Sequence, residues 1–465
     1  EKYIMSDIRF NNWKHQSGTG GVSQNSGGNV GIGSTLPSSK LDVGGDGKFT
    51  GIVTATTFIG ALTGNVTGNV NGVVTPSGDL NVGSNIKIGN ASGIITATSY
   101  RGDASQMTGA GLGTDGSANT SGIITATAFV STQGQLSHRN KVINGAMAVS
   151  QRGTTFASTL SEGQYTMDRF MHSIRGTNDS YYYQVSDSPD GFNKSMKVTC
   201  NSTYTPSGSD NAGFITSLEG QDLQDFAFGT SSAKSITISF YAKSGSQNNG
   251  HQYSFQIRTH PSGGATNRIV TKAFTVTSSW QRFTMTFPGD TGADITDGNT
   301  VGMQLLWWLD AGPTDIISQI PSFTSSGSYR SVTGQDHFLN NTSNEFYITG
   351  VQLEVGTVAT PFEFRSFGEE LSRCMRYYEG VYMTDGTAMM KSYASYGGSA
   401  NFEYQFKVEK RTTPTFSLEG NASWSGATPN AFESRSSCLF QDNGGTLFSL
   451  GDAHNDLCAS FTAEL

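Results

Sequence analysis

The chain has 465 residues, which is enough for two or three domains of ordinary size. Charged residues make up 14% of it and glycine numbers 58, a composition typical of short strands and turns rather than long exposed helices. The formal net charge of −8 comes from scattered residues, without the basic stripe of a nucleic-acid-binding protein, so no nucleic-acid partner is expected. No run of 18 apolar residues occurs, so membrane insertion is not expected either.

Residues 1–139 are rich in glycine and poor in aromatic residues. They hold 26 of the 58 glycines but only seven aromatic side chains, too few for a monomeric core. A short strand-like unit recurs as GIVTAT from Gly51 and as GIITAT from Gly93 and Gly122, and the unequal spacing excludes a regular solenoid. Strands of this kind can bury their apolar residues against other copies of the same chain. The segment is therefore predicted to be a homo-oligomeric stalk, and its N-terminal end is expected to attach the protein to a larger assembly.

Residues 140–365 contain many short alternating runs separated by Gly, Ser, Asn and Asp. Alternation of apolar and polar residues with frequent turns predicts a jelly-roll-like antiparallel β-sandwich, a fold also found in carbohydrate-binding proteins. The clearest runs are SITISFYAKS (235–244), QYSFQIRTH (252–260), WQRFTMTFPG (280–289) and VGMQLLWWLD (301–310).

One helix is predicted over residues 366–380. Ser366 and Glu369 have the spacing of a capping box, and Gly380 suits the position after a helix end. The helix is expected to link the sandwich to a smaller β domain over residues 381–465. The predicted fold class is thus mostly β, with an elongated trimeric β stalk, the sandwich, one connecting helix and a C-terminal β domain.

Two tryptophans are candidates for sugar binding, because the apolar face of a sugar stacks on an exposed aromatic ring. Strand parity in VGMQLLWWLD places Trp307 on the apolar face and Trp308 on the more polar face, so Trp308 is the candidate there. Trp424, in the turn-like ASWSGATPN, is the second. The alternative for both rings is ordinary packing.

Two groups of aspartates, one of which includes a histidine, have spacings that could hold Ca²⁺ or another divalent ion. Alternate residues of a strand point to one side, and loop carboxylates provide hard oxygen ligands. A solvated strand edge and an ordinary turn are the alternatives, and no other cofactor is expected. The two groups are Asp452, His454 and Asp456 in GDAHND, and Asp290, Asp294 and Asp297 in GDTGADITDG.

Enzymatic activity is not predicted. The sequence contains neither GxSxG nor HExxH, and its acidic residues form no recognisable pair across a sugar cleft. A polysaccharide-degrading spike is therefore the weakest of the functional alternatives.

Several segments resemble tail-fibre-like structural proteins of tailed bacteriophages, especially viruses of cyanobacteria. GNVGIGSTLPSSKLDV (28–43) and the GIITAT units resemble the shafts of these proteins. The chain departs from the family pattern in lacking a recognisable virion-docking domain at its start and a self-cleaving chaperone at its end. Resemblance to the distal sandwich region is carried by NKVINGAMAVSQRGTTF (140–156), YTMDRF (165–170), TGVQLEVGTVATPFEFRSFGEELSRCMRYYE (349–379) and FTAEL (461–465).

The resemblance implies a homotrimeric adhesin that is assembled in the host cytoplasm and located in the virion. Its N-terminal end is expected to attach to other tail, baseplate or neck proteins, and its distal β domains to bind host surface polysaccharide or lipopolysaccharide. A second interpretation is a neck, collar or tail scaffold that contacts only virion proteins. A third is the polysaccharide-degrading tailspike.

Overall fold

The computed structural model describes most of the chain beyond residue 137 and shorter stretches before it. The chain divides into two compact units, residues 1–122 and 123–465. The domain boundaries drawn from the sequence stay predictions. The described residues are 12–14, 21–52, 54, 56, 80–82, 86–88, 95–97, 137–157, 160–176, 179–325, 331–382, 390–392, 400–419, 423–425, 430–442, 448–451 and 457–465.

The first unit contains two small sheets in its described residues. The second GIITAT copy contributes β7, which pairs antiparallel with β6 of the same chain. The first copy is described only in part, and the third lies outside the described residues. The sheets are β1 (Asn12–Trp13), β2 (Val22–Gln24), β3 (Val30–Ile32) and β4 (Leu41–Val43), and β5 (Leu80–Val82), β6 (Ile86–Ile88) and β7 (Ile95–Ala97).

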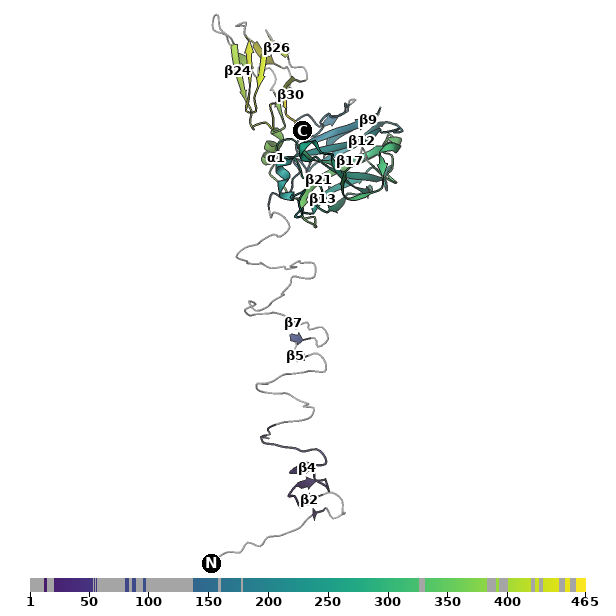
Figure 1. Ribbon diagram of the computed structural model, residues 1–465, viewed down its shortest axis with the longest axis vertical. Helices are drawn as coiled ribbons and strands as arrows, with labels where there is room; N and C mark the ends of the chain where they lie inside the picture. Colours follow the sequence, from purple (N-terminus) through teal and green to yellow (C-terminus); the bar gives the residue numbers. More distant parts are fainter. Residues whose placement is uncertain are drawn as a thin grey trace, which may run out of the picture. The chain divides into compact units, whose positions relative to one another are not determined.

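The second unit is built around two six-stranded antiparallel sheets (Figure 1). We name them after their central strands. The β17 sheet has the order β19 (Ile320–Ser325), β15 (Arg268–Thr275), β14 (Gln252–Thr259), β17 (Val301–Ala311), β12 (Asn211–Glu219), β9 (Phe170–Arg175). The β21 sheet has the order β16 (Gln281–Phe287), β13 (Ile236–Ser244), β21 (Glu345–Val355), β11 (Ser195–Ser202), β10 (Asp179–Val185), β8 (Thr155–Phe156).

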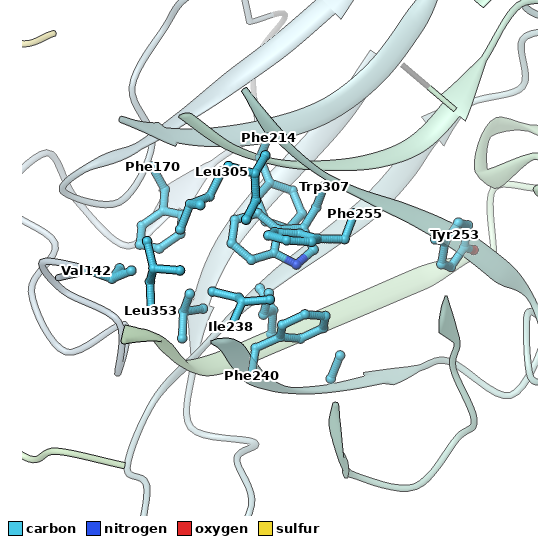
Figure 2. Packing of buried hydrophobic residues seen from close by; sticks show 14 of the residues in the cluster. Val142, Phe170, Phe214, Ile238, Phe240, Tyr253, Phe255, Leu305, Trp307 and Leu353 are labelled. Atoms are coloured by element: carbon cyan, nitrogen blue, oxygen red, sulfur yellow. The ribbon is translucent and has the colours of Figure 1, made fainter. Parts of the chain in front are cut away.

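The core lies between these sheets and follows from their alternation. Trp307 of β17 is fully buried, as its parity predicts. Its ring stacks on Phe214 at 5.3 Å between centroids and meets Phe240 of the opposite sheet edge-on at 5.6 Å. Figure 2 shows Trp307 among Phe214, Phe255 and Phe240, with aliphatic side chains beside them. Aromatic residues from both sheets therefore hold the sandwich together.

A connection between β17 and β21 covers part of the outer face of the β17 sheet. It contains two short parallel strands, β18 (Ile316–Ile317) and β20 (Ser331–Val332), and β20 contacts β14, β15 and β17. The backbone N–H of Val332 donates to Ser254 Oγ of β14 at 3.0 Å. Two residues that follow β20 are also bonded to the sheet. His337 Nδ1 and Leu339 N donate hydrogen bonds to Asp310 of β17 at 2.7 Å and 2.8 Å.

The predicted helix is present but ends earlier than expected. Helix α1 spans Phe367–Met375, and Ser366 caps its start by accepting a hydrogen bond from Glu369 N at 3.2 Å. Gly380 does not follow the helix end directly. It lies inside strand β22, which pairs with β30.

Short 3₁₀ turns occur at η1 (Gly220–Phe226), η2 (Ser262–Gly264), η3 (Pro313–Asp315) and η4 (Phe338–Asn340). None of the helices in the described residues is long and apolar enough to span a bilayer.

The remaining described strands form three small antiparallel sheets. A fully buried ion pair joins Lys410 Nζ to Glu379 at 2.6 Å, and Arg411 Nη1 donates to the carbonyl of Asn299 in the sandwich at 2.7 Å. The sheets are β22 (Tyr378–Tyr382), β30 (Leu457–Thr462) and β25 (Thr415–Leu418); β23 (Met390–Ser392), β29 (Phe448–Gly451) and β26 (Ser423–Ser425); and β24 (Ala400–Gln405), β28 (Ser437–Asp442) and β27 (Asn430–Glu433). The predicted mostly β fold with a jelly-roll-like antiparallel sandwich is confirmed.

Candidate functional site

The outer face of the β21 sheet carries alternating aromatic and lysine side chains. Tyr183, Lys197, Tyr347 and Lys243 are successive cross-strand partners on β10, β11, β21 and β13. Trp280, directly before β16, extends this series at the edge strand. We call these five residues the aromatic–lysine row.

The row exists because each strand alternates between the core and the outer face. Met196, Ile348 and Ala242, the chain neighbours of row residues, are fully buried in the core. Cross-strand neighbours on one face lie about 5 Å apart, so the residues of the opposite parity form a continuous line. The sheet therefore brings together side chains from five separate stretches of sequence.

Cation–π contacts hold the row in place. Lys243 Nζ lies 4.7 Å from the centroid of the Tyr347 ring and 5.5 Å from that of Trp280. Lys197 Nζ lies 5.4 Å from the Tyr347 centroid on the other side. At exposed sites such a contact contributes about 0.5–1 kcal/mol. The ammonium groups are thereby positioned before any ligand arrives.

Two carboxylates balance the charge of the two lysines. Asp187 accepts hydrogen bonds from Lys243 Nζ at 2.6 Å and from Trp280 Nε1 at 3.1 Å, and Glu345 forms an ion pair with Lys197 at 2.6 Å. Burial is the largest single influence and opposes ionisation of both carboxyls. The lysine hydrogen bonds and charges, together with the hydrogen bonds from Trp280 and Tyr347, outweigh it and lower the pKa of Asp187 and of Glu345. Lysine donors and carboxylate acceptors thus lie side by side. This arrangement suits a ligand with hydroxyl groups, because a hydroxyl both donates and accepts hydrogen bonds.

An apolar cavity of about 250 Å³ is lined by Phe192, Phe362 and Phe364. The ring centroids of these three residues lie 4.9–5.1 Å apart, and Tyr241 of β13 is 5.4 Å from Phe192. Gly350, with φ of 64°, permits this approach, because a Cβ there would lie 2.8 Å from the Phe192 ring and 2.9 Å from Tyr241. We call this feature the phenylalanine cavity.

The structure corrects the expectation for Trp308. The ring lies on the opposite face of β17 from Trp307, as predicted, but it is also fully buried. It packs with Ile215, Leu306 and Met171 on the outer face of the sheet. A ligand cannot stack on Trp308 in this state.

Asp290, Asp294 and Asp297 are not brought together as ion ligands. Asp290 is buried and paired with Arg268, whose Nη2 donates to its Oδ1 at 2.9 Å. Asp294 accepts a hydrogen bond from Ser262 N at 3.2 Å, and Asp297 is exposed. Among the described residues, no group of three or more His, Cys, Asp or Glu could hold a metal ion.

The other predicted site residues stay untested. Trp424 lies in β26, where its backbone pairs with Leu450 of β29, but its side chain is outside what the structure describes. Asp452, His454 and Asp456 lie outside the described residues.

The sequence contains a signal for the aromatic–lysine row. SITISFYAKS, WQRFTMTFPG and FYITGVQLE each place aromatic or basic residues at the parity opposite to their apolar positions. That parity places Tyr241 and Lys243 on an outer face. Strand order, which makes Lys243 a neighbour of Tyr347 and Trp280, could not be obtained from the runs themselves.

Comparison with solved structures finds similarity at low sequence identity. The enzymatically active domain of tailspike protein 4 of bacteriophage CBA120 is 13% identical over 47% of this chain and 21% of that chain, with a TM-score of 0.25. The chain thus spans about a fifth of that structure's length. A family 11 carbohydrate-binding module of a Clostridium thermocellum cellulosomal cellulase is 15% identical over 44% of this chain and 97% of that chain, with a TM-score of 0.24.

A xylan-binding domain of Paenibacillus barcinonensis is 12% identical over 44% of this chain and 94% of that chain, with a TM-score of 0.23. No protein-family model and no curated protein matches the chain.

Proposed function

We propose that this protein is a glycan-binding fibre of a tailed-phage virion and that the outer face of the β21 sheet is its binding surface. The observation that supports this best is the aromatic–lysine row. Its Lys197 and Lys243, together with their carboxylate partners Glu345 and Asp187, offer paired donors and acceptors beside aromatic rings. Sugars are recognised by this combination of hydroxyl hydrogen bonds and ring contacts. The ligand is host surface polysaccharide or lipopolysaccharide, and the protein has no catalytic role.

The fibre works as a homotrimer. In the first unit the polar side chain of Ser23 is buried, whereas Val22, Ile32 and Leu41 of the same sheet are exposed. A sheet that exposes its apolar residues gains stability when another copy covers them. Light scattering on the intact chain is expected to give three times the 49.4 kDa chain mass, and a monomer contradicts this part of the proposal.

The binding test compares two lysines in similar settings. Lys243→Met removes the cation of the row that lies between Tyr347 and Trp280. Lys141→Met is the control, because Lys141 also pairs with a carboxylate, Asp225, at 3.0 Å and lies 6.0 Å from the ring of Phe226, outside the row. Binding is measured on a panel of immobilised bacterial lipopolysaccharides and capsular polysaccharides.

We expect saturable binding by the parent and the control, and at least a tenfold loss for Lys243→Met, because a hydrogen bond to a charged group contributes about 1.5–3 kcal/mol. Equal binding by both variants, with both folded, contradicts the placement of the site. Absence of binding to the whole panel contradicts glycan recognition itself.

A second candidate function is a scaffold that contacts other virion proteins. Two aromatic rings at the phenylalanine cavity favour it. Phe364 and Phe367, which also lines this cavity, are 59% and 61% exposed, and exposed apolar patches mark protein contacts. Blocking of phage adsorption by the purified protein supports the adhesin and not the scaffold. Release of oligosaccharide from host envelope supports the tailspike alternative. The connection to viruses of cyanobacteria stays a prediction of the resemblance.

A further inference from the structure

A second cavity, of about 330 Å³, lies where the C-terminal strands pack against the sandwich. Both parts contribute polar and aromatic side chains to its wall, and pockets at such junctions are frequent ligand sites. Its volume is within the range of small-molecule sites. The sandwich provides Arg152, Gln164 and Tyr165, and the C-terminal part provides Tyr378, Glu419 and Thr462.

The wall is held rigidly by Arg152. Its guanidinium carbon lies 3.6 Å from the centroid of the Tyr378 ring and 5.3 Å from that of Tyr165. Nη2 of Arg152 donates to Glu464 at 3.0 Å, and Tyr165 donates its hydroxyl to the carbonyl of Leu465 at 2.7 Å. These contacts fix the guanidinium before a ligand binds, which lowers the entropy cost of binding.

Arg152 retains donor capacity at this cavity. Its side chain is 12% exposed, and its Nη1 is buried without a hydrogen-bond partner among the described residues. A guanidinium has five N–H donors, and the hydrogen bond from Nη2 to Glu464 uses one of them. Among the described residues on the cavity wall, Arg152 is the one cation, so its guanidinium is the charged donor available to a ligand oxygen.

Glu419 supplies the opposite chemistry. Its Oε1 accepts a hydrogen bond from Ser460 Oγ at 2.5 Å, and a carboxylate has room for further donors. An anionic ligand would meet the carboxylate of Glu419, and a cationic one would meet Arg152. A neutral polyol satisfies both ends, because its hydroxyls accept from the guanidinium and donate to the carboxylate.

We propose that this cavity binds one neutral hexose residue, as a second sugar site separate from the aromatic–lysine row. Its ligand class rests on the proposed glycan-binding function. A hydroxyl accepts from Arg152, another donates to Glu419, and Gln164 borders the same space. Two sites on one chain raise the avidity for a polymeric glycan without any new contact.

The test uses the full chain and free monosaccharides. Glucose, galactose, mannose and N-acetylglucosamine are titrated by ligand-observed NMR, with glucuronate and glucosamine as the charged comparisons. Glu419→Gln removes the carboxylate charge while it keeps the shape of the side chain. Glu409→Gln is the control, because Glu409 is a 61% exposed carboxylate whose ion pair with Arg435 lies away from the cavity wall.

We expect saturable binding of at least one neutral sugar, unchanged in Glu409→Gln and weakened about tenfold in Glu419→Gln. Equal affinity of Glu419→Gln and the parent overturns the site. Tighter binding of glucuronate or glucosamine than of every neutral sugar overturns the ligand class, and no saturable binding of any sugar overturns both.

Lys243→Met separates this inference from the proposed function. Monosaccharide binding that persists in Lys243→Met, together with loss of polysaccharide binding, supports two separate sites. If no polysaccharide binds but a neutral hexose does so through Glu419, the cavity stands while the proposed role of the row fails.

Discussion

The two outer faces of the sandwich differ in what covers them. On the β17 sheet, Leu306 and Trp308 are fully buried, and the connection that carries β20 is hydrogen-bonded to the sheet through Ser254. On the β21 sheet, Lys197 and Lys243 retain 23% and 16% of their side-chain exposure. Both sheets have six antiparallel strands and the same alternation. The difference teaches that an outer-facing parity does not by itself make a side chain available to a ligand.

Trp308 is expected to give the largest effect. Trp308→Ala removes a fully buried ring from the covered face and should lower the free energy of unfolding by about 3–5 kcal/mol, measured by urea denaturation. Trp280→Ala, on the open face where the ring is half-buried, is the matched change and should cost clearly less. Similar losses in the two variants contradict the distinction between the faces.

His172 should make the stability of the sandwich depend on pH. Burial lowers its pKa to about 4 from 6.5. The Tyr182 hydroxyl donates to the Gly213 carbonyl and lies 2.9 Å from His172 Nδ1, so the neutral ring donates through Nδ1. Because the unfolded chain binds the proton more tightly, stability falls as pH falls from about 6.5 to 4, by about 3 kcal/mol in total.

The carboxylates of the open face also lose their contribution as pH falls, but at lower pH than His172, which allows the two effects to be separated. Asp187 and Glu345 have folded pKa values below their ordinary values of 3.8 and 4.5, so their contribution is complete above these values and is lost only at lower pH. Unfolding free energies of the parent and His172→Gln are compared at pH 7, 6, 5 and 4. The prediction is contradicted if the free energy of unfolding falls by the same amount from pH 7 to pH 4 in the parent and in His172→Gln.

Ser254→Ala removes one hydrogen bond to the segment that covers the β17 sheet, so its effect on the free energy of unfolding should be smaller. The change leaves the buried N–H of Val332 without its acceptor and should cost about 1–3 kcal/mol in urea denaturation. Ser279→Ala, in an exposed turn, serves as the control and should change stability by less than about 0.5 kcal/mol. An equal effect of the two changes means that this hydrogen bond does not hold the segment down.

Lys243→Met should have the smallest effect on stability. The lysine contributes a partly exposed ion pair and two cation–π contacts, so the expected loss is about 0.5–1 kcal/mol, smaller at high salt. Chemical denaturation at low and high ionic strength measures it. A loss as large as that of Trp308→Ala assigns the row to stability rather than to binding.

Local pattern could be predicted wherever it depends on residue order alone. Alternation in VGMQLLWWLD placed Trp307 in the core and Trp308 on the other face, and Ser366 with Glu369 marked the start of α1. The end of the helix was predicted wrongly at Gly380. That residue belongs to β22, whose pairing with β30, distant in sequence, overrides the local signal.

The sequence by itself determined the β class, the contrast between a glycine-rich first part and an aromatic second part, and the opposite faces of Trp307 and Trp308. Only the tertiary structure decided that Trp308 is covered, that Asp290 belongs to Arg268, and that Lys243 lies between Tyr347 and Trp280. The reason is physical. Alternation is a property of one strand. Strand order and the path of a covering segment depend on contacts between residues far apart in sequence, such as Lys243 and Tyr347.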